Sequence, residues 1–322
     1  MKILYVGNDS PSSLLQLERF RARPKNFEVR YAGFNNSLSE IGVDYTLDPI
    51  GNSSRTGRVK RSNLDRYISE IAAYRPNLII NDFDFPTSYA ATELGIPYWL
   101  ASSTLLYFGM PKLMKQTIKI GQYFTNLFEN FAYNHIYQIT NADRLLMYSC
   151  LGDMSMCPEL LPRFEWVRPY HIKASYSERQ PAFIATLMET DKKFIKYLSN
   201  LGDTNLYSPF EYEKYKNINH LNILNNISYA EDLNQAYLCF NRGESSLVAD
   251  AFYNEKYSLI YPNVKNIDTI INGHVFQYLK LAERIYTRES FDQINSLAQR
   301  DMNVKVRLDP GVKYLDEYIG EL

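Results

Sequence analysis

Short apolar runs alternate with amphipathic segments through the first half of the chain, and polar turns separate them. An apolar run that ends at a Gly, Asn or Asp cluster is typical of a buried strand, whereas apolar residues spaced by three and four positions are typical of a helix. The pattern predicts strands at 2–6, 27–33, 44–47, 78–80, 98–101 and 144–148, and helices at 12–23, 63–74 and 87–94. The aromatic segment 105–137 is expected to be helical, with a break near Gly121.

The same alternation restarts in the second half, with strands expected at 183–187, 204–207, 221–224, 236–240 and 258–261. Strands that alternate with helices are typical of parallel, doubly wound sheets. We therefore predict an α/β fold with two Rossmann-like doubly wound parallel-sheet domains that face a central cleft. The expected domains are 1–157 and 173–311, joined by a proline-containing linker at 158–172 and followed by a terminal helix at 312–322.

Composition narrows the class of protein. A chain of 322 residues with 45% hydrophobic positions is long enough to fill two cores, and its net charge of −1 argues against binding nucleic acid through overall charge. Three cysteines, one of them (Cys239) within an apolar strand pattern, favour a reducing compartment over a disulfide framework. The chain opens on a strand pattern and has no apolar run near 18 residues, so we expect a cytoplasmic protein. Neither the cysteines nor the four histidines have metal-ligand spacing.

The segment 226–281 carries the clearest chemistry. Its apolar run 236–240 leads into the turn Asn241-Arg242-Gly243-Glu244-Ser245-Ser246, and a helix pattern follows. In a parallel sheet such a turn joins the carboxyl end of a strand to the N-terminus of a helix, where backbone N–H groups and the helix dipole favour an anion. A nucleotide fits this pattern, because its phosphates need N–H donors and its ribose needs a carboxylate such as Asp250.

These residues resemble a motif of the GT-B glycosyltransferases, in particular the branch of the peptidoglycan N-acetylglucosaminyltransferase and related UDP-sugar transferases. The resemblance rests on Glu231-Asp232-Leu233, Arg242-Gly243, Asp250-Ala251, Ile260-Tyr261-Pro262 and the cluster 268–273. In the first half, the stretch PNLIINDFDFPTSYAATELGIPYWLAS is similar to the corresponding family phrase. The chain departs from the family where Glu244 replaces a glycine, Asp250 a glutamate, Tyr257 a proline and Thr269 a glutamine.

The resemblance implies an inverting, metal-independent glycosyltransferase that needs no cofactor beyond its nucleotide-sugar donor, with UDP favoured over GDP or dTDP. The donor-binding residues that it implies are Met188, Glu189, Ser228, Tyr229, Arg242, Gly243, Glu244, Ser245, Ser246, Asp250, Asp268, Thr269 and Asn272. Several of them also have a structural alternative: Asp250 as a helix-surface acid, the serines and Asp268 as helix caps, and Arg242 as a partner of Asp232.

Inverting transfer needs a base that removes the proton of the acceptor hydroxyl. Asp9, in the loop after the first strand, is the leading candidate, and Asp82 and Asp84 are held in reserve. Aspartates that follow parallel strands are often only helix caps, so this alternative stays open for all three.

The acceptor is less defined. Arg55, Arg58, Lys60 and Arg61 form a basic run that fits either a solvated loop or an anionic acceptor such as a lipid pyrophosphate. A polysaccharide, a small molecule and a modified nucleic-acid base are equally open as acceptors. The basic and aromatic segment 105–137 fits either peripheral contact with the inner face of a membrane or packing between domains. A sugar-nucleotide epimerase of the same fold and a non-catalytic nucleotide-sugar-binding subunit are the alternative functions.

Overall fold

The computed structural model describes residues 1–7, 11–33, 45–46, 61–109, 134–148, 162–173, 183–186, 191–201, 204–207, 221–224, 229–236, 238–262, 267–278, 282–285, 291–298 and 312–322. The chain divides into two compact units. Unit 1 comprises Met1–Ser149, Cys157–Arg168 and Gly311–Leu322, and unit 2 comprises Cys150–Met156 and Pro169–Pro310.

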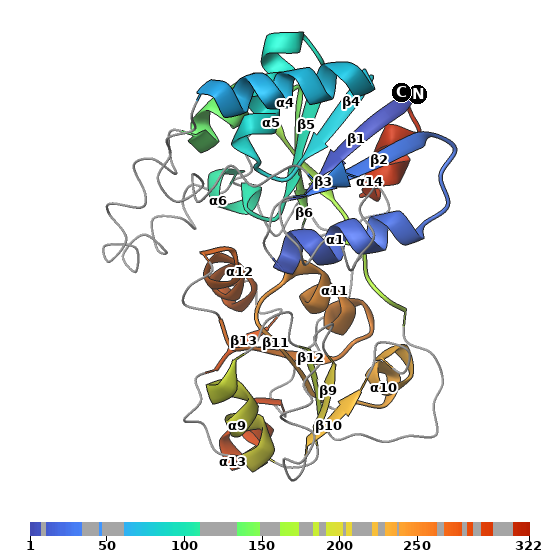
Figure 1. Cartoon of the computed structure of the whole chain (residues 1–322). Helices are drawn as coiled ribbons and strands as arrows, with labels where there is room; N and C mark the ends of the chain where they lie inside the picture. The colour runs from blue at the N-terminus through green and yellow to red at the C-terminus, as the bar shows by residue number, and fades with distance from the viewer. Residues whose placement is uncertain are drawn as a thin grey trace. The chain divides into compact units, whose positions relative to one another are not determined.

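Unit 1 is built on a seven-stranded, fully parallel sheet in the order β3-β2-β1-β4-β5-β6-β7. Its central strands are buried on both faces, which is why they appear in the sequence as continuous apolar runs. Figure 1 shows α1 on one side of this sheet and α4 and α5 on the other. The strands are β1 (Lys2–Val6), β2 (Glu28–Gly33), β3 (Tyr45–Thr46), β4 (Leu78–Asn81), β5 (Tyr98–Ser102), β6 (Arg144–Tyr148) and β7 (Phe164–Val167); the helices are α1 (Pro11–Ala22), α4 (Arg61–Tyr74), α5 (Phe85–Leu94), α6 (Leu105–Gly109) and α14 (Leu315–Ile319).

One segment near the domain boundary differs from the sequence-based expectation. The range 158–172, expected as a linker, contains β7, which pairs in parallel with β6 through Leu145 and Phe164. The prolines at 158, 162 and 169 flank this strand and leave its hydrogen-bonding residues free of proline. The terminal helix α14 belongs to unit 1, where the Tyr318 hydroxyl donates to the Trp166 carbonyl oxygen over 3.0 Å.

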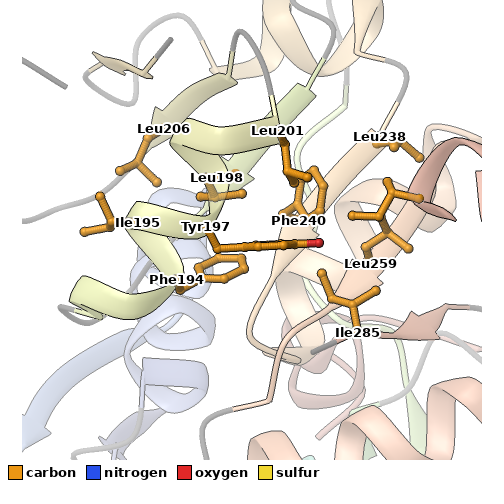
Figure 2. Packing of buried hydrophobic residues seen from close by; sticks show 12 residues of the cluster. Phe194, Ile195, Tyr197, Leu198, Leu201, Leu206, Leu238, Phe240, Leu259 and Ile285 are labelled. Carbon is orange, nitrogen blue, oxygen red and sulfur yellow. The ribbon is translucent and has the colours of Figure 1, made fainter. Parts of the chain in front are cut away.

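Unit 2 is built on a six-stranded, fully parallel sheet in the order β10-β9-β8-β11-β12-β13. Figure 2 shows the apolar face of α9, with Phe194, Tyr197 and Leu198, packed toward residues of β11 and β12. The strands are β8 (Phe183–Thr186), β9 (Thr204–Tyr207), β10 (Leu221–Leu224), β11 (Leu238–Asn241), β12 (Tyr257–Ile260) and β13 (Glu283–Arg284); the helices are α9 (Lys192–Leu201), α10 (Tyr229–Gln235), α11 (Ser245–Tyr253), α12 (Ile267–Tyr278) and α13 (Phe291–Ala298).

Both units have the Rossmann strand order, so the prediction of two doubly wound parallel sheets is confirmed. In each sheet the direction of winding reverses between the first strand and the fourth, which are β1 and β4 in unit 1 and β8 and β11 in unit 2. Ligands of doubly wound sheets bind outside the carboxyl ends of the strands at this reversal. The fold therefore singles out the residues after β1 and β4, and those after β8 and β11.

The long helix expected at 105–137 is described only in part. Helix α6 covers Leu105–Gly109 and residues 134–141 are helical, while 110–133 lie outside the described residues. Among the helices that the structure describes, none has the length and apolar character needed to cross a membrane.

Candidate functional site

The turn between β11 and α11 has a backbone shape that requires glycine. Gly243 has a φ of 99°, in the left-handed region, and a Cβ atom placed on it would lie 2.8 Å from the Thr269 carbonyl oxygen. Its N–H donates to the Asn241 side-chain oxygen over 2.9 Å, and the Asn241 amide in turn donates to Ser258 on β12. The turn is therefore hydrogen-bonded to its own sheet and packs closely against Thr269 of α12.

Asn272 of α12 joins the two parts of the predicted site. Its amide nitrogen donates to the Gly243 carbonyl oxygen over 2.8 Å and to the Ser245 hydroxyl over 3.2 Å. The oxygen of the same amide, Oδ1, is buried and accepts no hydrogen bond from the described residues. The structure therefore brings Asn272 and Thr269 to the 242–246 turn; the Asp268 side chain lies outside the described residues.

Glu244 occupies the position that begins α11. Its backbone has the extended conformation of an N-cap, and its carbonyl oxygen accepts from the N–H groups of Leu247 and Val248, each at 3.0 Å. Its side chain makes no capping bond: the carboxylate turns back and accepts from the Arg242 N–H over 3.0 Å. Glu244, Ser245 and Ser246 are all fully buried.

Arg242 has a different partner from the one considered in the sequence. Its guanidinium lies 2.6 Å from Asp191, at the start of α9, and 4.7 Å from the centre of the Tyr261 ring. Burial favours a higher pKa for Asp191, but the Phe194 N–H and the Arg242 guanidinium outweigh it and lower that pKa. Asp232 is instead a buried acceptor for the Asn205 amide (2.7 Å) and the Tyr207 hydroxyl, so an Arg242–Asp232 pair is wrong.

Asp250, expected at the ribose, is fully buried on α11 and not a surface acid. One carboxylate oxygen accepts from the Ile172 N–H over 2.7 Å, and the other accepts from the Tyr229 hydroxyl over 3.0 Å. The structure thus places two predicted donor residues, Tyr229 and Asp250, in direct contact. Of the remaining predicted donor residues, Met188, Glu189 and Ser228 lie outside the described residues.

In unit 1, two of the three candidate bases, Asp82 and Asp84, lie after β4, next to the point where the winding reverses. Asp82 follows β4, and its N–H donates to the carbonyl oxygen of Val6, the last residue of β1. Asp82 is 6% exposed. The pKa of Tyr5 is raised, mainly because Tyr5 is buried and next because of the negative charge of Asp82. Asp84 accepts from the Thr87 N–H over 2.9 Å and caps α5. Asp9 lies outside the described residues, as do Arg55, Arg58, Lys60 and the side chain of Arg61.

An aromatic group beside Asp82 and Asp84 was not predicted from the sequence. Phe83 has a φ of 55°, a left-handed conformation that is uncommon for a bulky residue and is concentrated at functional sites. Its ring centre lies 4.4 Å from the His135 imidazole, which also stacks on Phe108 at 5.7 Å. The three residues are far apart in the chain, and no spacing in the sequence points to their contact.

His274, near the predicted donor residues Thr269 and Asn272, is held neutral. Burial and the nearby Arg284 guanidinium lower the pKa of His274 to about 4. Arg284 contacts the His274 ring over 2.8 Å. Within the described ranges, no three His, Cys, Asp or Glu side chains gather into a group that could hold a metal ion.

No protein-family model matches the chain, and no curated protein matches it. Solved structures do. The spinosyn rhamnosyltransferase SpnG complexed with thymidine diphosphate matches with a TM-score of 0.62 at 11% identity, over 92% of this chain and 91% of that chain. SsfS6 of Streptomyces sp. SF2575, a glycosyltransferase also complexed with thymidine diphosphate, matches over the whole of both chains with a TM-score of 0.61 at 13% identity. The glycotransferase of kitacinnamycin matches with a TM-score of 0.57 at 16% identity, over 92% of this chain and 89% of that chain.

At these identities the likeness shows the fold, which is the GT-B fold of glycosyltransferases. It supports no special relation to the peptidoglycan branch.

Proposed function

We propose that the protein is a glycosyltransferase in which unit 2 binds a nucleotide-sugar donor and unit 1 binds the acceptor. The observation that carries the proposal is the 242–246 turn. It lies at the carboxyl end of β11, next to β8 where the sheet reverses, and it opens a nine-residue helix. The GT-B fold, shared with two glycosyltransferases solved with thymidine diphosphate, supports the same reading.

The donor is proposed to be a pyrimidine nucleoside diphosphate sugar. The sequence motif favours UDP, and the two matched complexes hold thymidine diphosphate, so the two bases are the first to compare. Asn272, with a buried amide oxygen that accepts no bond from the described residues, is placed to accept from a sugar hydroxyl. For Asp250 to bind the ribose, the hydroxyls have to share or replace its bonds to Ile172 and Tyr229.

Transfer is proposed to proceed with inversion. A carboxylate removes the proton of the acceptor hydroxyl while its oxygen bonds to the anomeric carbon, and the bond from that carbon to the diphosphate oxygen breaks. Asp9 is the first candidate base and Asp82 the second, because both follow strands at the reversal in unit 1. The proposal requires no metal ion; activity that disappears with EDTA and returns with Mg²⁺ would contradict this part.

The acceptor is proposed to bind beside Phe83, Phe108 and His135, where an aromatic group adjoins the candidate bases. An anionic acceptor recognised by Arg55, Arg58, Lys60 and Arg61, and contact with a membrane surface through 105–137, remain proposals of the sequence alone.

The test begins with thermal-shift screening against UDP, dTDP, GDP and ADP. Selective stabilisation by UDP or dTDP is expected, because only these carry a pyrimidine. The matching sugar nucleotides are then incubated with and without an acceptor panel. Release of nucleoside diphosphate that depends on an acceptor supports transfer, whereas turnover of the donor alone identifies an epimerase. Asp9→Asn is expected to abolish transfer while donor binding persists.

One observation favours a second function, that of a non-catalytic nucleotide-sugar-binding subunit. A buried carboxylate, Glu244, stands where the related motif has glycine, and the Arg242 guanidinium is paired with Asp191. Stoichiometric donor binding with no transfer or hydrolysis against any acceptor would establish this alternative.

A further inference from the structure

The phosphate end of the proposed donor site already holds an anion of its own. Glu244 is fully buried at the start of α11, and its carboxylate accepts from the Arg242 N–H over 3.0 Å. A main-chain N–H in the turn that leads into a helix is a type of donor that phosphates use. The carboxylate therefore takes up a donor that the proposed ligand needs.

Charged and neutral groups both lie around this turn. The Arg242 guanidinium is engaged by Asp191 at 2.6 Å, so a second carboxylate lies near the turn. From α12, Asn272 brings a neutral amide and Thr269 its backbone carbonyl, and His274 is held neutral by its low pKa of about 4. Arg284 of β13 lies beyond Gly273, and its guanidinium contacts His274.

Two further buried atoms at the turn point to a ligand. Arg242 is 2% exposed, and its Nε atom has no hydrogen-bond partner among the described residues. Asn272 is 1% exposed, and its Oδ1 atom likewise has none within that part of the chain, although its Nδ2 atom contacts both Gly243 and Ser245. Buried polar atoms are nearly always hydrogen-bonded, so a donor and an acceptor without partners beside one helix start indicate a missing polar ligand.

We propose that Glu244 occupies the phosphate subsite as a built-in anion and sets the charge selectivity for the donor. This inference rests on the proposed function. A nucleoside diphosphate has to displace the Glu244 carboxylate from the Arg242 N–H, and the cost of displacement and repulsion grows with the charge of the phosphates. Arg242 Nε then donates to a phosphate oxygen, and Asn272 Oδ1 accepts from the sugar.

The test compares affinities for uridine, UMP and UDP, and for dTDP, by titration calorimetry. Glu244→Gln keeps the side-chain length and an oxygen that accepts from Arg242 but removes the charge; Glu244→Gly restores the residue of the related motif. Glu255→Gln, an exposed acid just beyond the other end of α11, is the matched control. Thermal unfolding midpoints establish that each variant is folded.

The expected result is a rise of about tenfold in UDP or dTDP affinity in both Glu244 variants, a smaller rise for UMP and none for uridine. Glu255→Gln leaves all affinities unchanged. Equal UDP affinity in folded wild-type and both Glu244 variants overturns the inference while leaving the proposed function standing. If no nucleotide binds to the wild-type protein or to either folded variant, both the inference and the proposed function are overturned.

Discussion

At the scale of single residues, the candidate site depends on a few positions where one side chain decides the local structure. Gly243 is the strictest, because it has both a left-handed φ and no space for a Cβ. Gly95 provides a comparison: its φ is 64°, also left-handed, but nothing lies within 4 Å of the Cβ it would gain. The two glycines therefore separate backbone strain from steric clash.

We expect Gly243→Ala to lower the free energy of unfolding by about 3 kcal/mol or more, and Gly95→Ala by about 1 kcal/mol. The difference arises because the alanine methyl group at 243 meets the Thr269 carbonyl oxygen, so α12 has to shift. Urea unfolding of both variants measures the two costs. Equal losses would mean that the turn relaxes without strain and that its shape does not require glycine.

His274 predicts a pH dependence of stability. Its pKa in the folded chain is about 4, below the ordinary value of 6.5, so the unfolded chain binds its proton first as the pH falls. The free energy of unfolding is therefore expected to decrease as the pH falls from about 6.5 to 4. Below pH 4 this residue causes no further decrease. His274→Gln should remove this part of the slope. Denaturant midpoints measured at pH 7 and pH 4.5 for both proteins test it, and parallel pH profiles would contradict it.

At the scale of elements, the strands were largely predictable because parallel strands buried on both faces appear as short apolar runs. β7 was missed, since the three prolines around Phe164–Val167 suggested a linker. The contact between Arg242 and Asp191 spans 51 positions, and the ring contact between Phe83 and His135 depends on how the 134–141 helix packs. Contacts of this kind follow from the packing of elements, which no local pattern in the sequence specifies.

Asp84 is the site residue whose role an element explains. It caps α5 through the Thr87 N–H, and Asn81 fixes the same turn by accepting from the Asp84 N–H over 2.8 Å. Asp84→Asn keeps an acceptor for Thr87, so we expect stability within about 0.5 kcal/mol of wild type and retained transfer activity; Asp84→Ala should cost about 1 kcal/mol. Unfolding and steady-state assays test both variants. A large fall in kcat for folded Asp84→Asn would make it the base.

At the scale of the whole molecule, the two units repeat one strand order, and the last residues of the chain return to the first unit. The links that attach this end to unit 1 include the Arg23–Asp316 ion pair at 3.1 Å, the hydrogen bond from the Arg168 N–H to the Lys313 carbonyl oxygen at 2.9 Å, and the hydrogen bond from the Tyr318 hydroxyl to Trp166. Leu315 and Ile319 are fully buried there. The sequence predicted a helix at this end but contained no signal for which unit it joins.

Deletion of 312–322 is therefore expected to destabilise unit 1, although these residues directly follow unit 2 in the chain. Burying one aliphatic side chain contributes about 1.5–3 kcal/mol, so losing Leu315 and Ile319 should lower the stability of unit 1 by several times RT. Hydrogen exchange resolved by peptide measures each unit separately: β1, β2 and β7 should exchange faster, while β8, β11 and β12 keep their rates. Arg23→Ala in the full-length chain is the milder variant, because it removes one partly exposed ion pair and one contact with the Tyr314 ring, and it should cost about 1 kcal/mol. Faster exchange in the strands of unit 2, with unit 1 unaffected, would show that the terminal helix stabilises unit 2 and would contradict the assignment made from these contacts.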